Sequence, residues 1–144
     1  MDLSKILTIS GKPGLYKIIS QAKAGFLVES LIDSKRIPAF STDKISSLRE
    51  ISIFTEDTDV ELKVVFQKIF EQENNQPIAD LKKKSEKEII SYFVSILPDY
   101  DRERVYVSDM KKVLSWYNLL LANDLIDLIK DEEVSAEESA ENNQ

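Results

Sequence analysis

The sequence predicts an α+β fold in which a small β-rich part precedes a bundle of three helices. All three glycines lie within the first 25 residues, between short runs rich in β-branched and aromatic residues. From about residue 58 onward, apolar residues recur at helical spacing, and capping-box sequences precede two of these runs. We therefore expect a β-rich domain at residues 1–56, a helical domain at 57–130 and a disordered acidic tail at 131–144.

The β-rich part is predicted to contain a helix-like start over residues 2–7 and four strands. Residues 11–14 (Gly-Lys-Pro-Gly) form a tight turn, and residues 22–25 join the first two strands as a hairpin. Pro38 places its strand at an edge, and a helical turn is expected near residues 46–48. The expected strands are 15–20, 26–32, 37–41 and 51–54. This order favours a small SH3-like β-barrel, with a curled, open antiparallel sheet of four strands as the alternative.

Three amphipathic helices are predicted in the second half. The segments 58–61 and 85–88 are capping boxes, in which a hydroxyl group and a glutamate carboxylate satisfy the first free amides of a helix. Ser108 is the expected N-cap of the third helix, which extends to about Ile129, and residues 105–107 are expected to be extended. The three apolar stripes are Leu62, Val65, Phe66, Ile69 and Phe70; Ile89, Ile90, Phe93, Val94 and Leu97; and Met110, Val113, Leu114, Tyr117, Leu120 and Leu121.

Several strings along the chain resemble a known family. They are DLSKILTISGKPGLYK at residues 2–17, KISSL at 44–48, ISIFT at 51–55, LPDYDRERVY at 97–106 and SDMKK at 108–112. They resemble an uncharacterised Bacteroidetes domain-of-unknown-function family, over about residues 1–122. The resemblance implies an SH3-like N-terminal part and a helical C-terminal part, and it brings no known activity or ligand.

The net charge of −7 is distributed unevenly along the chain. Residues 131–144 carry six acidic residues and no basic one, residues 62–130 are neutral, residues 56–61 carry four acidic residues and no basic one, and residues 1–55 carry a net +3. The tail has too few apolar groups to offset the entropy cost of ordering, so it is predicted to be disordered. It is either a solubilising terminus or an arm that mimics nucleic acid and screens the basic N-terminal part.

The composition excludes much of enzyme chemistry because the chain has neither histidine nor cysteine. Disulfides, cysteine nucleophiles, Ser-His-Asp triads and ordinary zinc sites are all excluded. Asp99-x-Asp101-x-Glu103 imitates a calcium-binding loop, but Arg104 and Met110 occupy the positions that require glycine and glutamate. We therefore expect no catalytic residue, no metal and no cofactor. Without a signal sequence or an apolar span, we expect a cytoplasmic protein and no membrane partner.

The candidate surface for a partner or for nucleic acid combines basic residues with aromatic ones, a pattern typical of proteins that hold phosphates and stack bases. Trp116 lies off the main apolar stripe of its helix, which suits a protein contact or the seam between the two halves. The candidate residues are Lys12, Tyr16, Lys17, Lys23, Lys35, Arg36 and Trp116.

The leading functional prediction is a non-enzymatic cytosolic protein-interaction module with a protein partner of unknown identity. The alternative is a weak RNA- or ribosome-associated protein that uses the basic N-terminal barrel, with the acidic tail as an autoinhibitor. Nucleic acid is the less favoured partner, because a net charge of +3 over 55 residues attracts phosphates only weakly. A magnesium-dependent enzyme that relies on carboxylates is the third hypothesis.

Overall fold

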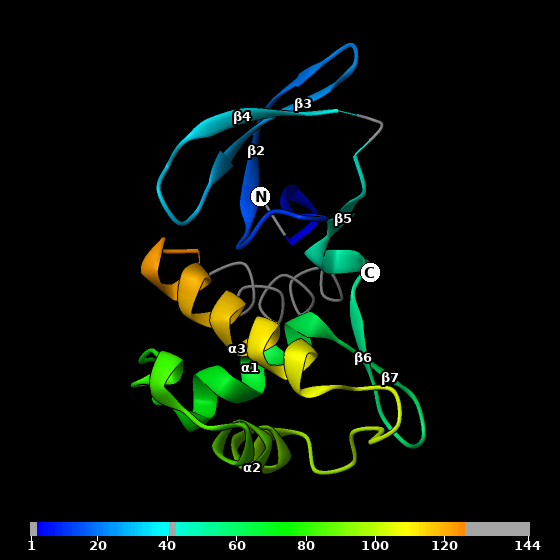
Figure 1. Cartoon of the computed structure of the whole chain (residues 1–144), viewed down its shortest axis with the longest axis vertical. Coiled ribbons are helices and arrows are strands. Elements are labelled where there is room, and N and C mark those ends of the chain that lie inside the picture. The colour runs from blue at the N-terminus through cyan, green and yellow to red at the C-terminus, as the bar shows by residue number, and fades with distance from the viewer. Residues whose placement is uncertain (1–2, 41–42, 126–144) are drawn as a thin grey trace, which may run out of the picture.

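The computed structural model describes residues 3–40 and 43–125, and it confirms the α+β class (Figure 1). The strands are β1 (Ile6–Ile9), β2 (Tyr16–Ala22), β3 (Gly25–Ser30), β4 (Arg36–Phe40), β5 (Ile45–Ser47), β6 (Ser52–Phe54) and β7 (Asp59–Glu61). The α-helices are α1 (Leu62–Gln72), α2 (Glu86–Ile96) and α3 (Val107–Ala122). Short 3-10 helices are η1 (Leu3–Lys5), η2 (Leu48–Glu50) and η3 (Leu81–Lys83).

Five strands form an antiparallel sheet in the order β4-β3-β2-β1-β5, and β6 pairs with β7 in a separate hairpin. Of the two topologies expected, the structure has the open sheet and not the closed barrel, and it has five strands rather than four. The edge strand β4 offers few free donors, because Pro38 lacks an N–H and the Phe40 N–H donates to Asp43 Oδ2 at 2.9 Å. At the other edge, the Ser47 N–H donates to Glu50 Oε1 at 3.2 Å.

The helix-like start predicted over residues 2–7 is largely wrong. Only residues 3–5 form a helical turn, and Ile6–Ile9 is a strand that pairs with both β2 and β5. Its side chains alternate, so Ile6 joins the main core while Leu7 and Ile9 pack on the opposite face of the sheet. A β-branched run lying between two neighbouring strands therefore prevails over the weak helical signal.

The first helix begins later than its predicted capping box. Residues 59–61 form β7, and the Thr58 N–H donates to Thr55 Oγ1 at 3.0 Å within the hairpin turn, so the predicted box at 58–61 is wrong. The second box is confirmed. The Ser85 N–H donates to Glu88 Oε1 at 2.8 Å, and the Glu88 N–H donates to Ser85 Oγ at 3.2 Å, at the start of α2.

The third helix begins at Val107, with Tyr106 rather than Ser108 as the N-cap residue. The Tyr106 N–H donates to Asp109 Oδ2 at 3.0 Å, so the carboxylate of Asp109 satisfies an amide at this end. The extended segment predicted for 105–107 therefore ends one residue early. The helix stops at Ala122, before the predicted end, and the rest of the predicted extension from residue 126 lies outside the described residues.

The main core combines both halves of the chain. It joins Leu3, Ile6, Leu15, Leu31 and Leu48 to apolar residues of all three α-helices. A smaller cluster covers the other face of the sheet and contains Leu7, Ile9, Tyr16, Val28 and Ala39. The boundary predicted between residues 56 and 57 falls in the turn between β6 and β7, while the acidic tail predicted at 131–144 lies outside the described residues.

Candidate functional site

A groove of about 750 Å³ lies between the N-terminal sheet and α3. The 11–14 turn and the strands β1 and β5 form one wall, and the first half of α3 forms the other. Figure 1 shows α3 next to the sheet, with α1 and α2 on its far side. The groove is therefore built from segments that are far apart in the sequence.

Four exposed lysines line this groove, and we call it the lysine groove after Lys12, Lys44, Lys111 and Lys112. Within residues 3–40 and 43–125, none of them forms an ion pair. The nearby carboxylate in the groove is that of Asp109, which accepts the Tyr106 N–H. The described residues carry 18 acidic and 18 basic side chains, so the positive charge of the groove is a local excess that attracts anions.

Backbone hydrogen bonds fix the main chain of two of these lysines at the same end of the paired strands β1 and β5. The Ser10 N–H donates to the Lys44 carbonyl oxygen at 2.9 Å, and the Lys12 N–H donates to the Ile9 carbonyl oxygen at 3.0 Å. The other two are neighbours in the first half of a regular helix. The backbone at all four lysines is thus held in place, so a multiply charged ligand has to order only their side chains on binding.

A smaller hollow of about 160 Å³ continues the groove past Trp116, and we call it the apolar socket. Its apolar walls are Ile51, Ile53, Phe54, Val105, Val113 and Trp116. Trp116 is half-buried and lines both hollows, as do Ile51, Asp109 and Lys112. The Arg104 guanidinium lies over the Phe54 ring at 4.1 Å from its centroid and closes one side of the socket.

Two of the predicted site residues, Lys12 and Trp116, both line the lysine groove. Tyr16 is 7% exposed and packs in the smaller cluster, so its ring has no free face for stacking. Lys23 lies in the turn between β2 and β3, and Lys35 lies just before β4, so the length of β3 separates them. These placements show that the predicted surface does not form one continuous patch.

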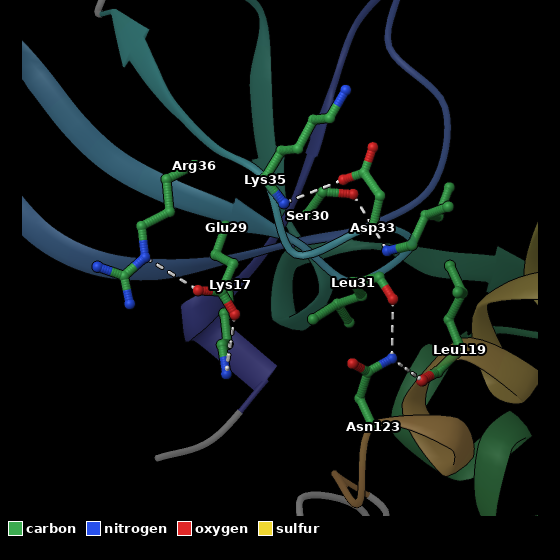
Figure 2. A network of polar contacts seen from close by, with 10 residues as sticks. Lys17, Glu29, Ser30, Leu31, Asp33, Lys35, Arg36, Leu119 and Asn123 are labelled. Carbon is green, nitrogen blue, oxygen red and sulfur yellow. Dashed lines mark hydrogen bonds and ion pairs between the residues drawn. The ribbon is translucent and has the colours of Figure 1, made fainter.

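Lys17 and Arg36 are both paired with Glu29 on neighbouring strands (Figure 2). Lys17 Nζ lies 3.5 Å from Glu29 Oε2, and Arg36 Nε donates to Glu29 Oε1 at 3.0 Å. The hydrogen bond from Arg36 holds the pKa of Glu29 below its ordinary value, and the positive charge of Lys17 acts in the same direction. A carboxylate therefore partly balances the charge of these two predicted site residues.

Three residues of the groove were not among the predicted site residues: Lys44, Lys111 and Lys112. Lys44 and Lys111 are 67 residues apart, so sequence spacing does not indicate that they meet. The one local signal was the Lys111-Lys112 pair one turn before Trp116, the aromatic residue already singled out. The pairing of β1 with β5 brings Lys44 to Lys12, and the docking of α3 against the sheet brings Lys111 and Lys112.

The described carboxylates give no support for a metal centre. Within residues 3–40 and 43–125 no group of three or more acidic residues is placed to hold a metal ion. In the 99–103 loop, Asp101 accepts from Arg104 Nε and from the Glu103 N–H, both at 2.9 Å, and the first of these bonds lowers the pKa of Asp101. No helix in the same described ranges is both long and apolar enough to cross a membrane.

Comparison with known proteins gives two family matches and one similar structure. Residues 3–48 match the domain of unknown function DUF5606, and residues 51–120 match the domain of unknown function DUF6852. No curated protein matches the chain. A solution NMR structure of a structural-genomics target from Bacteroides vulgatus is 43% identical, with a TM-score of 0.70, and the match covers 85% of this chain and 88% of that one. The chain therefore belongs to the Bacteroidetes family, of unknown function, that combines these two domains.

Proposed function

We propose that the protein is a non-enzymatic protein-interaction module whose lysine groove binds an acidic segment of a protein partner. The observation that carries this proposal is the convergence of four lysines, from the 11–14 turn, the start of β5 and α3, on one hollow. Four like charges held close together repel one another and are only weakly compensated by Asp109. A ligand that brings several carboxylates relieves this repulsion, which favours binding of an acidic segment.

The apolar socket favours a peptide over nucleic acid. A hollow of about 160 Å³ with mostly aliphatic and aromatic walls accommodates one bulky apolar side chain next to the charged groove. An oligonucleotide has no aliphatic side chain, and it needs several free aromatic faces for stacking. In the N-terminal sheet, Tyr16 is buried and offers no such face. The expected ligand is therefore a segment with several acidic residues next to one bulky apolar residue.

Binding through side chains also agrees with the state of the sheet edges. A peptide that added a strand to the sheet would need free N–H groups at β4 or β5. Pro38 in β4 has no backbone N–H, and the N–H groups of Phe40 and Ser47 already donate to carboxylates of the same chain. The edges of the sheet are thus poor docking sites, in contrast to the groove.

The test is fluorescence anisotropy with a labelled peptide of six glutamates followed by one leucine. The triple variant Lys44→Gln/Lys111→Gln/Lys112→Gln is expected to bind this peptide about tenfold more weakly or worse, because it loses three attractive charges. The matched control Lys23→Gln/Lys35→Gln/Lys82→Gln makes the same change in net charge at exposed lysines outside the groove. We expect it to change the affinity by less than about threefold.

Two outcomes would overturn the proposal. Equal losses in the groove variant and in the control would mean that the peptide responds only to net charge. Tighter binding of a labelled octamer of uridine RNA, with a steep salt dependence that the groove variant abolishes, would assign the groove to nucleic acid instead.

A further inference from the structure

We propose that residues 131–134 of the chain are themselves a ligand for the lysine groove and compete there with the protein partner. This inference rests on the proposed function because it concerns the same groove. Residues 131–134 combine acidic residues with one apolar residue, as we expect of the partner's segment. When they occupy the groove, the partner has to displace them in order to bind.

The order of residues in this segment agrees with the order of features in the site. Asp131, Glu132 and Glu133 are consecutive acids, and Val134 directly follows them as the one sizeable apolar residue of 131–144. In the site, the four lysines come first and the apolar socket follows, with Trp116 between them. When the three carboxylates of residues 131–133 contact the lysines, the side chain of Val134 therefore comes close to the socket. Residues 135–144 add three more acids but no apolar residue larger than alanine.

The segment is long enough to reach the groove. Lys112 precedes Ala122, the last residue of α3, by ten positions, which corresponds to roughly 15 Å along a helix. The six residues from Leu125 to Asp131 span up to roughly 20 Å when extended. Asn123 Nδ2 donates to the Leu31 carbonyl oxygen, so the end of α3 lies against the sheet, the element that also forms one wall of the groove (Figure 2).

The full chain contains its own reporter, because Trp116 is the single tryptophan and lines both hollows. Acrylamide, a neutral quencher of indole fluorescence, measures how open the groove is without responding to its charge. The variant Asp131→Asn/Glu132→Gln/Glu133→Gln removes the acids of the segment. The variant Glu137→Gln/Glu138→Gln/Glu141→Gln is the matched control, with the same change in net charge farther along the chain.

We expect the first variant to raise the acrylamide quenching constant of Trp116 and to bind the labelled glutamate peptide about fivefold more tightly, because an internal competitor is lost. The control variant is expected to change both measurements by less than about twofold. Val134→Ser, which leaves the charge intact, is expected to give an intermediate increase in quenching because it loses the contact with the socket.

The result that overturns the inference is the same quenching and the same affinity in the parent and in the first variant. If the groove lysines still control peptide binding in that case, the proposed function stands and only the competition is wrong. Conversely, the first variant could raise the acrylamide quenching constant of Trp116 and yet fail to bind the labelled glutamate peptide. That result overturns the proposed function alone. If the difference in Trp116 quenching between the parent and the first variant grows with protein concentration, binding within one molecule is overturned. The groove is then occupied by residues 131–134 of a second copy.

Discussion

The side-chain nitrogen of Asn123 lies 3.0 Å from the backbone carbonyl oxygen of Leu31, and this hydrogen bond joins the end of α3 to the sheet (Figure 2). The same nitrogen donates to the Leu119 carbonyl oxygen at 2.8 Å. One amide group therefore satisfies a carbonyl in the last turn of α3 and holds that helix against the end of β3. This contact helps to keep together the two walls of the lysine groove, which come from the sheet and from α3.

Replacing Asn123 tests this connection. Asn123→Ala removes both hydrogen bonds and is expected to lower the free energy of unfolding by about 1 to 2 kcal/mol. Asn123→Asp keeps the shape but places a carboxylate beside two carbonyl oxygens, and the loss is expected to be larger, about 2 to 3 kcal/mol. Urea denaturation followed by circular dichroism measures both values. An Asp variant as stable as the parent would contradict the role assigned to the donated hydrogen bonds.

The capping of two helices gives a second, paired prediction. Ser85→Ala removes the hydroxyl that accepts the Glu88 N–H and is expected to destabilise the protein by about 1 kcal/mol. Ser108→Ala changes an exposed serine inside the first turn of α3 and is expected to have an effect below about 0.5 kcal/mol. Thermal denaturation of the two variants separates the roles of these serines. A larger loss for Ser108→Ala would restore it as the N-cap that the sequence suggested.

Two glycines with positive φ differ sharply in their surroundings. A Cβ at Gly25 (φ +157°) would lie 2.0 Å from the carbonyl oxygen of Ala39 in the paired strand, whereas a Cβ at Gly11 (φ +84°) would meet nothing within 4 Å. Gly11→Ala is expected to cost about 1 kcal/mol from backbone strain alone. Gly25→Ala is expected to cost at least about 3 kcal/mol, because the β3–β4 pairing must shift. Chemical denaturation measures the free energy of unfolding of both variants. Equal losses would contradict this ranking and would mean that β3 and β4 adjust freely to the added Cβ.

The ion pairs of Glu29 predict a pH dependence of stability. Arg36 and Lys17 lower the pKa of this carboxyl in the folded state below its ordinary value of 4.5. The stabilisation is therefore present above about pH 4.5 and is lost as the pH falls below that value. Glu29→Gln is expected to lower the urea midpoint at pH 7 and to leave it nearly unchanged at pH 3.

The control for this measurement is Glu56→Gln, at an exposed glutamate in the turn between β6 and β7. Within the described ranges Glu56 forms no ion pair, so its replacement is expected to give the same small difference at both pH values. A difference for Glu29→Gln that is as large at pH 3 as at pH 7 would show that packing, and not charge, accounts for its effect.

Much of the candidate site was not predictable from the sequence. Lys12 and Trp116 were predicted and do lie in the groove, but Lys44, Lys111 and Lys112 were missed because no local pattern links them to the 11–14 turn. Lys17 and Arg36 were predicted as part of the candidate surface, and strand pairing places both beside Glu29. A count of charge along the chain does not indicate which charges meet in space. The groove follows from tertiary packing, and the pairs at Glu29 follow from sheet register.

The sequence by itself determined the features that depend on neighbouring residues. Turn residues defined the hairpin at residues 22–25, a capping box defined the start of α2, and the 3.6-residue period defined the three helices, the first two within a turn of their ends. The lack of histidine and cysteine likewise follows from composition alone.

The tertiary structure alone decided the features that depend on distant contacts. Pairing with β6 turned residues 59–61 from a predicted helix cap into a strand, and pairing with β2 and β5 turned residues 6–9 into β1. The five-stranded sheet is open and not closed into a barrel, and the docking of α3 against it creates the lysine groove and the apolar socket. The physical reason is the same in each case. The free energy of these contacts comes from pairing and packing between segments, over separations that range from 5 residues for Phe54 and Asp59 to 40 residues for Leu7 and Ser47. Local propensity is too weak to oppose it.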